Sequence, residues 1–268
     1  MILLPDVIHQ SGPDPGHPQW DTMITLRNLR PQTVTVRLKI LDEGGNLVLW
    51  PETRLDHHEF ELEPEMSFAA SFLPGNQFSS NPPQDFKGHA LLECWQRGPF
   101  GDIDVSGDVL VWALAAFNQW KYGVNLPGYH PGQDSFPRAR TLWQWVYAIP
   151  YYDDLQGATR ALWQTGVTIQ NYESRQARVK LSYTIGQTYQ EAGKMFEFPI
   201  EIPPAGGVRF DLLRGNPGQN VPGLLQAGYP PDLNSEGHID MVTDSPILLL
   251  PSLIIANQDY SFMVGETL

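Results

Sequence analysis

An internal duplication constrains the fold of this chain more than any other feature of its sequence. The segment Trp20–Asn28 reads Trp-Asp-Thr-Met-Ile-Thr-Leu-Arg-Asn, and Trp163–Asn171 reads Trp-Gln-Thr-Gly-Val-Thr-Ile-Gln-Asn. At a shift of 143 residues, Trp, both Thr and Asn are identical, and Ile and Leu meet Val and Ile. The register continues, with Val36–Leu38 opposite Val179–Leu181. Self-similarity at a fixed spacing indicates repeated structural units, so we predict two copies of one fold.

The match extends beyond these segments with small changes of shift, as loop insertions produce. The further pairs are Leu3–Pro5 with Ala148–Pro150, Leu62–Pro64 with Ile202–Pro204, Gly88–Ala90 with Gly237–Ile239, and Leu114–Gln119 with Leu253–Gln258. Each half is then about 125 to 140 residues long, a common size for one domain. We predict a first domain at 1–137, including a Gly/Pro-rich linker at about 125–137, and a second domain at 138–268. Because Leu3–Pro5 has a counterpart in the second copy, we expect the first residues to belong to the fold and not to a leader.

The residue pattern within each half predicts β-strands. The segments Thr33–Leu41 and Ala177–Ile185 alternate apolar and polar residues, which is typical of antiparallel sheets with one buried face. The chain also has 24 glycines and 24 prolines, too many interruptions for a helical bundle. We therefore predict an all-β chain of two tandem antiparallel β-sandwich domains, Ig-like or jelly-roll-like, related by internal duplication.

Charge and cysteine content restrict the partners. Lys and Arg total 17 against 30 Asp and Glu, giving a net charge of −13, and no basic cluster is present. Nucleic acid and anionic membranes are therefore poor candidates. A single cysteine, Cys94, leaves no disulfide and no thiolate set for zinc. The longest apolar runs, Val109–Phe117 and Ile247–Ala256, are shorter than the roughly 20 residues of a membrane span, and no signal peptide is visible. We expect no cofactor, no membrane insertion and, by default, a cytoplasmic location.

One segment has part of the pattern of a calcium loop. Oxygen-bearing side chains occupy its positions one, three, five and seven, and position six is glycine; these four residues are Asp102, Asp104, Ser106 and Asp108. Position twelve, where a glutamate should close the coordination shell, is Ala113. The alternative, which we favour, is a hairpin in which Ile103 and Val105 point inward and Ser106-Gly107 forms the turn.

The other titratable residues have ordinary structural interpretations. His57, Glu59 and Glu61 would share one face of a strand and could hold a metal, but a charged edge strand explains them equally. His89 and His238 recur in the duplication and are interpreted as structural. Cys94 lies among apolar residues, where a buried, inert thiol is expected. No hydrolase, metalloprotease or nucleotide-binding motif is present, although carboxylates could still converge in space.

Aromatic residues give the main candidate for a binding surface. In a regular strand, Trp143, Trp145 and Tyr147 would share one face, and Tyr151 and Tyr152 follow. Flat aromatic faces bind sugar rings in many carbohydrate-binding proteins, and amphipathic rings are also frequent at protein interfaces. A third interpretation is that the row packs in the core or against the first domain.

The second half resembles a family of small bacterial β-sandwich proteins, the sensory-rhodopsin-transducer proteins. The similarity covers most of residues 143–260 as a spacing of strands and turns. It lies in the segments Trp145–Tyr152, Gly166–Asn171, Ala177–Tyr183, Ile202–Pro204 and Val208–Asp211. The resemblance implies an oligomeric, non-enzymatic β-sandwich similar in shape to carbohydrate-binding modules. This chain differs in having two domains and a long loop at Leu73–Phe86, so we carry over the fold and not a photosensory role.

These observations favour a non-enzymatic interaction protein. The duplication, the missing catalytic motifs and the eight tryptophans lead us to expect self-assembly into a homo-oligomer or larger array, or binding to another protein. The alternative is a carbohydrate-binding protein that uses Trp143, Trp145 and Tyr147 as its platform. A hydrolase with carboxylates assembled in space is the third class.

Overall fold

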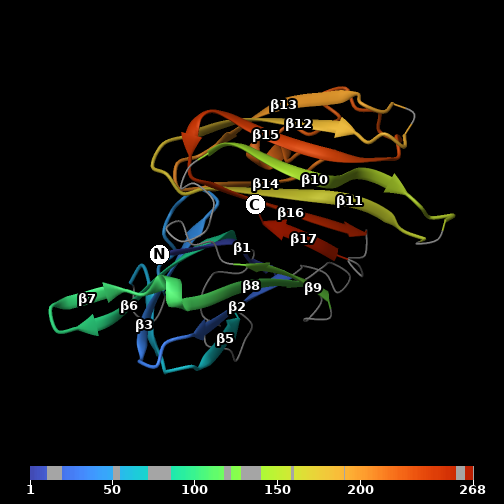
Figure 1. The fold of residues 1–268 in the computed structure, drawn as a ribbon. Helices are drawn as coiled ribbons and strands as arrows, with labels where there is room; N and C mark the ends of the chain where they lie inside the picture. Colours follow the sequence, from blue (N-terminus) through green and yellow to red (C-terminus); the bar gives the residue numbers. More distant parts are fainter. Residues whose placement is uncertain are drawn as a thin grey trace. The chain divides into compact units, whose positions relative to one another are not determined.

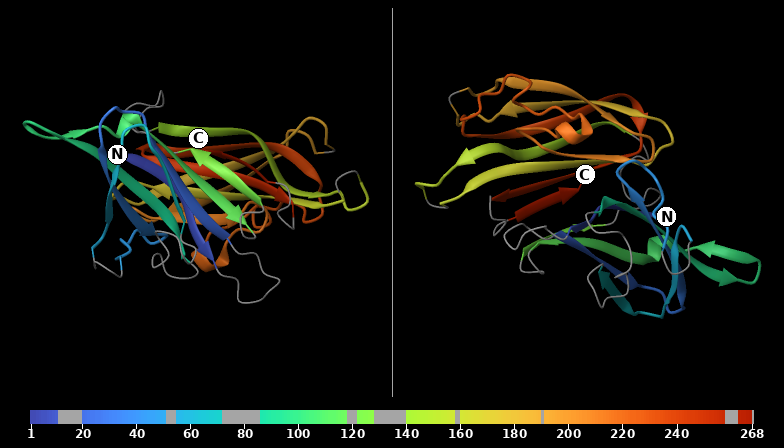
Figure 2. Two further views of the ribbon diagram at one scale, coloured as in Figure 1. Left: turned by 90° about the horizontal axis from the view of Figure 1, so that it is seen from below. Right: turned by 180° about the vertical axis from the view of Figure 1, so that it is seen from behind.

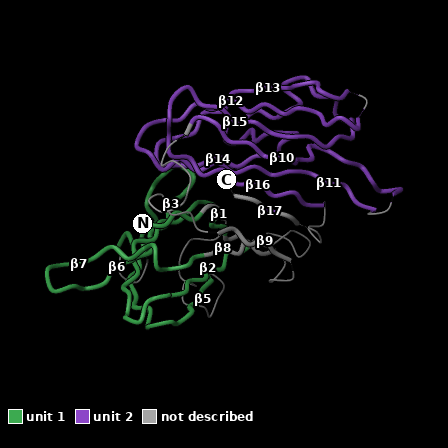
Figure 3. The backbone as a smooth tube through the Cα atoms, in the orientation of Figure 1, with its two compact units in different colours: residues 1–138 green, residues 139–268 purple. Residues whose placement is uncertain are grey.

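The structure is a computed structural model that describes residues 1–10, 20–50, 55–71, 86–117, 122–127, 140–157, 160–189, 191–257 and 263–267 (Figure 1). This part of the chain contains β-strands and two short 3-10 helices but no α-helix. None of its helices could span a membrane. It divides into two compact units, residues 1–138 and 139–268 (Figure 3). The fold prediction, two tandem antiparallel β-sandwiches, is confirmed.

The described part of the first unit contains nine strands and one 3-10 helix. They are β1 (Ile2–Gln10), β2 (Trp20–Asn28), β3 (Val34–Asp42), β4 (His58–Leu62), β5 (Ser67–Ser71), β6 (Phe86–Gly98), β7 (Gly101–Asp104), η1 (Ser106–Asp108), β8 (Val109–Phe117) and β9 (Tyr122–Pro127). The strands pair in the order β4-β3-β6-β1-β2-β8-β9, with β5 on β2 and β7 on β6. All pairs are antiparallel.

The described part of the second unit repeats this arrangement with eight strands and one 3-10 helix. They are β10 (Arg140–Asp153), β11 (Leu162–Asn171), β12 (Ala177–Ile185), β13 (Met195–Ile202), β14 (Gly207–Asp211), η2 (Pro217–Gln219), β15 (Ser235–Ile247), β16 (Leu249–Asn257) and β17 (Met263–Thr267). Their order is β13-β12-β15-β10-β11-β16-β17, with β14 on β11. Each strand of the first unit except β7 therefore has a counterpart in the second.

Within each unit the strands form two layers joined by one long strand. In the second unit, β10 pairs along β15 and only its end, Tyr152 and Asp153, pairs with β11, so it passes from one layer to the other (Figure 2). Strand β13 has the expected alternation, with Phe196, Phe198 and Ile200 buried between exposed neighbours. These side chains join those of β11 and β16 in one core, which is the burial that stabilises a sandwich.

The repeated Asn of the duplication has the same structural role in both units. Asn171 donates from Nδ2 to the carbonyls of Arg175 and Pro203, at 2.8 and 2.9 Å, and its Oδ1 accepts the N–H of Glu173 at 3.0 Å. Asn28 makes the equivalent three contacts. Its Nδ2 donates to the carbonyls of Gln32 and Glu63, and its Oδ1 accepts the N–H of Arg30. The buried Asn side chain thus forms hydrogen bonds with backbone groups that no neighbouring strand satisfies, which explains why both copies carry Asn here.

The first strand aligns between the two copies differently from the sequence prediction. Val7 pairs with Gly88 and Ala148 with Gly237, so Val7 and Ala148 are equivalent, at a shift of 141 residues. Thr22 and Thr165 support this alignment, because their hydroxyls accept the N–H groups of Ile8 and Ile149 respectively. The predicted match of Leu3–Pro5 with Ala148–Pro150 is therefore wrong by four residues. The predicted match paired two prolines, Pro5 and Pro150, that do not occupy corresponding positions in the two strands.

Two predicted segments lie largely outside the described residues. The predicted linker, 125–137, begins inside β9, and its remainder from residue 128 lies outside the described residues. The predicted loop at Leu73–Phe86 also lies outside them, apart from Phe86, which begins β6.

Candidate interaction surfaces

The predicted aromatic row is interrupted by the bulge in β10. Trp145 pairs with Ile239 and Ala148 with Gly237, so three steps along β10 match two along β15. A bulge of this kind reverses the side-chain alternation after the extra residue. Trp143 and Trp145 are accordingly 2% and 1% exposed, whereas Tyr147 is 46% exposed. The prediction that the three rings share a face is wrong, and the two tryptophans belong to the core, as in the third interpretation above.

Beyond the bulge, tyrosines gather around one carboxylate. Burial and the neighbouring Glu236, to which its hydroxyl is hydrogen-bonded, raise the pKa of Tyr147. The same two causes raise the pKa of Tyr189, which the sequence had not singled out. Tyr152 interacts electrostatically with both, and Tyr151 and Tyr152 are half-buried against the core. Tyr147 and Tyr189 thus lie beside Glu236, and Tyr152 lies near both tyrosines.

The outer face of β10 next to these tyrosines is apolar. Leu142 and Val146 are exposed, Val146 to 88%, and Leu142 lies opposite the exposed Val242 of β15. Between them, Gln144 donates a hydrogen bond of 2.8 Å to Asp240. We call Leu142, Val146, Tyr147 and Val242 the β10 face. Contiguous exposed apolar groups with a polar pair among them are typical of a protein interface.

The equivalent bulge of the first unit has different chemistry. Leu4 pairs with Ala90 and Val7 with Gly88, so Pro5 and Asp6 occupy the positions of Val146 and Tyr147. The backbone irregularity is shared by the two copies, whereas its apolar and aromatic side chains belong to the second unit alone. The duplication has therefore diverged at this surface while retaining its geometry.

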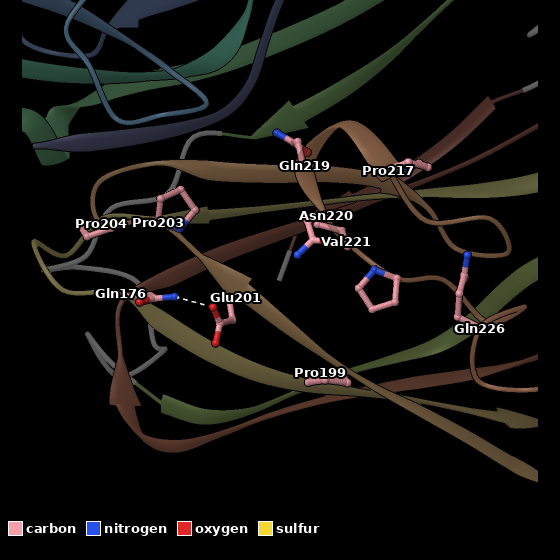
Figure 4. Close-up of a pocket in the computed structure, with 11 residues that line it drawn as sticks. Gln176, Pro199, Glu201, Pro203, Pro204, Pro217, Gln219, Asn220, Val221 and Gln226 are labelled. Carbon is pink, nitrogen blue, oxygen red and sulfur yellow. Dashed lines mark hydrogen bonds between the residues drawn. The ribbon is translucent and has the colours of Figure 1, made fainter.

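A groove of about 870 Å³ lies in the second unit, between the outer side of β13 and the loop that follows β14 (Figure 4). Five prolines, four amides, one valine and one carboxylate line it: Gln176, Pro199, Glu201, Pro203, Pro204, Pro217, Gln219, Asn220, Val221, Pro222 and Gln226. Its one carboxylate, Glu201, accepts a hydrogen bond from Gln176 at 2.9 Å and pairs with Arg178 at 3.1 Å. No lysine or arginine is among the lining residues that the structure describes.

The loop that walls this groove is held in one conformation. Asn216 and Val221 exchange backbone hydrogen bonds of 2.8 and 3.0 Å. Gln219 accepts the N–H of Arg209 at 2.8 Å, and Asn216 donates to the carbonyl of Arg209 at 2.7 Å. A preformed wall lowers the entropy cost of binding. The spacing of the prolines in the sequence did not indicate a groove.

The calcium-loop candidate does not form a coordination shell. Asp104 accepts from the N–H and hydroxyl of Ser106, at 2.9 and 2.6 Å, and these bonds keep its pKa below the usual value despite partial desolvation. Asp108 instead pairs with Arg30. Among the described residues no group of acidic, histidine or cysteine side chains could hold a metal ion. Asp102 lies on β7, which pairs with β6 in a hairpin. The turn of this hairpin is Pro99-Phe100, not Ser106-Gly107 as predicted.

Two details of the predicted hairpin are corrected. Ile103 is exposed, because the arm formed by β7 and the end of β6 has no layer packed over it, whereas Val105 is buried as predicted. Ser106 and Gly107 lie in η1, the turn that leads into β8. A hollow of about 370 Å³ at the base of the arm includes Glu93, which pairs with Arg37 and Lys39.

The remaining candidates do not gather into one cluster in the described residues. Glu59 and Glu61 lie on β4, which ends the strand order of its sheet, and Glu59 pairs with Arg37 at 3.2 Å. His57 contacts Asp56 at 2.7 Å instead of the two glutamates. Cys94 is buried, and desolvation raises the pKa of its thiol to about 12. His89 is buried and His238 exposed, so the two copies give this histidine different surroundings.

Comparisons with known proteins give only distant likenesses. No family model matches the sequence, and no curated protein matches it. The crystal structure of Thermotoga maritima 1070 superposes with a TM-score of 0.30 and 12% identity over 48% of this chain and 90% of that one. A calcium-binding mutant of Bacteroides uniformis β-glucuronidase 2 gives 0.20 and 12%, over 97% of this chain and 27% of the enzyme. TM-scores this low establish no common fold, and the resemblance to sensory-rhodopsin-transducer proteins stays a prediction.

Proposed function

We propose that this protein is a non-enzymatic interaction protein that associates with itself through the β10 face. The observation that carries the proposal is the exposure of Val146 and Tyr147 at a bulge that aims them outward, next to Leu142 and Val242. Burying such side chains in an interface yields about 1.5 to 3 kcal/mol each when the contact is complete. The two units have bulges at the same position, but only the second carries Val146 and Tyr147 there. This difference supports a separate role for the surface of the second unit.

Neither alternative class gains comparable support. A carbohydrate platform requires exposed rings, and two of the three residues assigned to it, Trp143 and Trp145, are buried. A hydrolase of the usual two-carboxylate type requires one carboxylic acid with a raised pKa. In the hollow at the base of the β6–β7 arm, Asp104 has a lowered pKa and Glu93 is paired with cations. Among the described residues that line the groove, Glu201 is the one carboxylate.

The first unit supplies a variant that removes the surface while respecting the bulge. Replacing Val146→Pro together with Tyr147→Asp installs the residues that the first unit carries at the same positions. The matched control is Met195→Asp, at an equally exposed apolar side chain of β13 outside the β10 face. Light scattering coupled to size-exclusion chromatography measures the mass of each.

The expected result is an oligomer for the wild type and the control, and a smaller species for the double variant. Because the chain carries a net charge of −13, association should strengthen when added salt screens this repulsion. A monomeric wild type at high concentration and high salt would refute the proposal. So would a double variant that keeps the wild-type mass.

A further inference from the structure

Strand β10 has an unpaired backbone edge over its first half. From Arg140 to Ala148 it pairs with β15 on one side, and on the other side it reaches β11 only at Tyr152 and Asp153. Among the described residues, no strand pairs with this other side before Ala148. An unpaired strand edge presents a row of N–H and C=O groups that can pair with another chain.

The hydrogen bonds of β15 fix which of its residues bond toward β10. The N–H of Gly186, next to β12, donates to the carbonyl of Glu236 at 2.8 Å. Hydrogen-bonded positions alternate along an antiparallel pair, and β12 and β15 pair without a register shift. Every second residue from Glu236 therefore bonds toward β12, and the residues between, which include Ile239 and Met241, bond toward β10.

This alternation leaves three residues of β10 directed at its unpaired edge. The two β15 residues pair with Trp145 and Trp143, whose main-chain groups therefore point to β15. The N–H and C=O groups of Leu142, Gln144 and Val146 then point the opposite way. In the part of the chain that the structure describes, no backbone group outside β10 and β15 bonds with them.

The same edge is closed just beyond the bulge. The N–H of Ile149 donates to Oγ1 of Thr165 at 3.0 Å, and this hydroxyl donates to the carbonyl of Ile149 at 2.8 Å. Thr165 lies on β11, so these bonds are made on the side away from β15. The open part of the edge therefore ends at the bulge.

The first unit blocks the corresponding edge. Its strand β1 carries Pro5 at the position of Val146. Proline has no N–H and is accepted in sheets where the N–H would point away from a partner strand, which agrees with the direction found for Val146. Asp6 follows it, and proline and charge are both devices that keep strand edges from pairing. The second unit has neither at its bulge, so its edge can accept a strand.

The open edge is complementary to a second copy of itself. The segment Leu142–Val146 reads Leu-Trp-Gln-Trp-Val, which keeps its character when it is reversed. Two copies paired antiparallel about a two-fold axis at Gln144 would place Leu142 opposite Val146 on the outer face. On the inner face, Trp143 would lie opposite Trp145. Apolar and aromatic cross-strand pairs of this kind stabilise antiparallel sheets.

We infer that β10 of one molecule pairs edge to edge with β10 of a second copy, antiparallel and centred on Gln144. This inference rests on the proposed self-association and specifies the contact that makes it. The three outward residues of each copy would exchange about six main-chain hydrogen bonds. The contact is isologous and closes on itself, so it yields a dimer in which two sheets become one.

The first test separates the main chain of β10 from the side chains of the β10 face. In the full chain, Gln144→Pro removes the N–H at the proposed axis and leaves the four residues of the β10 face in place. It breaks no bond to β15, because this N–H points away from β15. The matched control, Gln144→Thr, removes the same side chain and keeps the N–H. Sedimentation velocity over a range of concentrations measures association, and circular dichroism verifies folding.

We expect Gln144→Pro to weaken dimerisation about thirtyfold, because the two hydrogen bonds donated at the axis are lost. Gln144→Thr should dimerise within about threefold of the wild type, since it keeps both bonds. A Gln144→Pro variant that associates as tightly as Gln144→Thr would overturn the edge pairing and leave association through the β10 face standing. A monomeric wild type would overturn both.

A disulfide measurement does not depend on the proline variant. At a hydrogen-bonded antiparallel pair the Cα atoms lie about 5.5 Å apart, within the span of a disulfide. Gln144→Cys should therefore form a covalent dimer under mild oxidation, while the native Cys94 is buried. The control is Thr141→Cys, exposed on the same strand, whose two copies would lie roughly 20 Å apart and stay unlinked. No covalent dimer of Gln144→Cys, or equal linking of both variants, would contradict the inference.

Discussion

Gly237, the partner of Ala148 at the bulge, offers a sharp test of how closely β12 approaches β15. A Cβ added to this residue would lie 2.1 Å from the carbonyl oxygen of Thr184 and 2.9 Å from the ring of Tyr183. Real Cβ atoms essentially never approach closer than 3.0 Å, so the Gly237→Ala contact is about 0.9 Å too short. Thr184 lies on β12, which is paired on both sides by β13 and β15 and therefore cannot withdraw cheaply.

We expect Gly237→Ala to lower the unfolding free energy of the second unit by about 3 kcal/mol, the upper part of the range for overpacked sites. For a unit of this size that is roughly 10 °C in the midpoint of thermal unfolding. Differential scanning calorimetry should show one transition moving and the transition of the first unit unchanged. Gly88→Ala should lower the transition temperature of the first unit and leave that of the second unchanged, because its Cβ would lie 1.9 Å from the carbonyl oxygen of Leu41.

The control is Gly166→Ala on β11, where the added Cβ would be 3.9 Å from the nearest carbonyl oxygen, an ordinary contact. This variant should unfold close to the wild-type temperature. If Gly237→Ala and Gly166→Ala unfold at the same temperature, the close approach of β12 does not require glycine at Gly237, and our explanation of this glycine is refuted.

Two further predictions concern buried polar groups. Asn171→Asp keeps the acceptor for the N–H of Glu173 but turns a carboxylate toward the carbonyls of Arg175 and Pro203. We therefore expect the free energy of unfolding, measured in urea, to fall by about 2 to 4 kcal/mol. An Asn171→Asp variant as stable as the wild type would contradict the shared role of this residue. The raised pKa of Cys94, about 12 against 9.0 for a free thiol, predicts that folded protein resists alkylation at pH 8. It also predicts that this thiol's contribution to stability is complete below pH 9 and lost as pH rises toward 12, because the unfolded thiol ionises first. Rapid alkylation of native protein, or equal pH dependence in Cys94→Ala, would show that the thiol is not buried as described.

The sequence determined the architecture to a large extent, because alternation of apolar and polar residues reports which face of a strand is buried. Residues Ala177–Ile185 were predicted as a strand and form β12 with the same bounds. The duplication likewise predicted that the two halves would share one fold, and the common strand order bears this out. The repeated Asn28 and Asn171 were visible as letters, although their hydrogen bonds were not.

Only the tertiary structure decided which of these residues face solvent. One extra residue in β10 separates Tyr147 from Trp143 and Trp145, and a bulge is set by the pairing of β10 with β15, not by the letters of β10 alone. The groove depends in the same way on bringing Pro199 of one strand and Pro217 of a later loop to one place. Strand identity is a local property of the chain, whereas register, bulges and grooves arise between segments far apart in sequence. For that reason the sequence predicted the sandwiches, and the structure located the surfaces on which the proposed association depends.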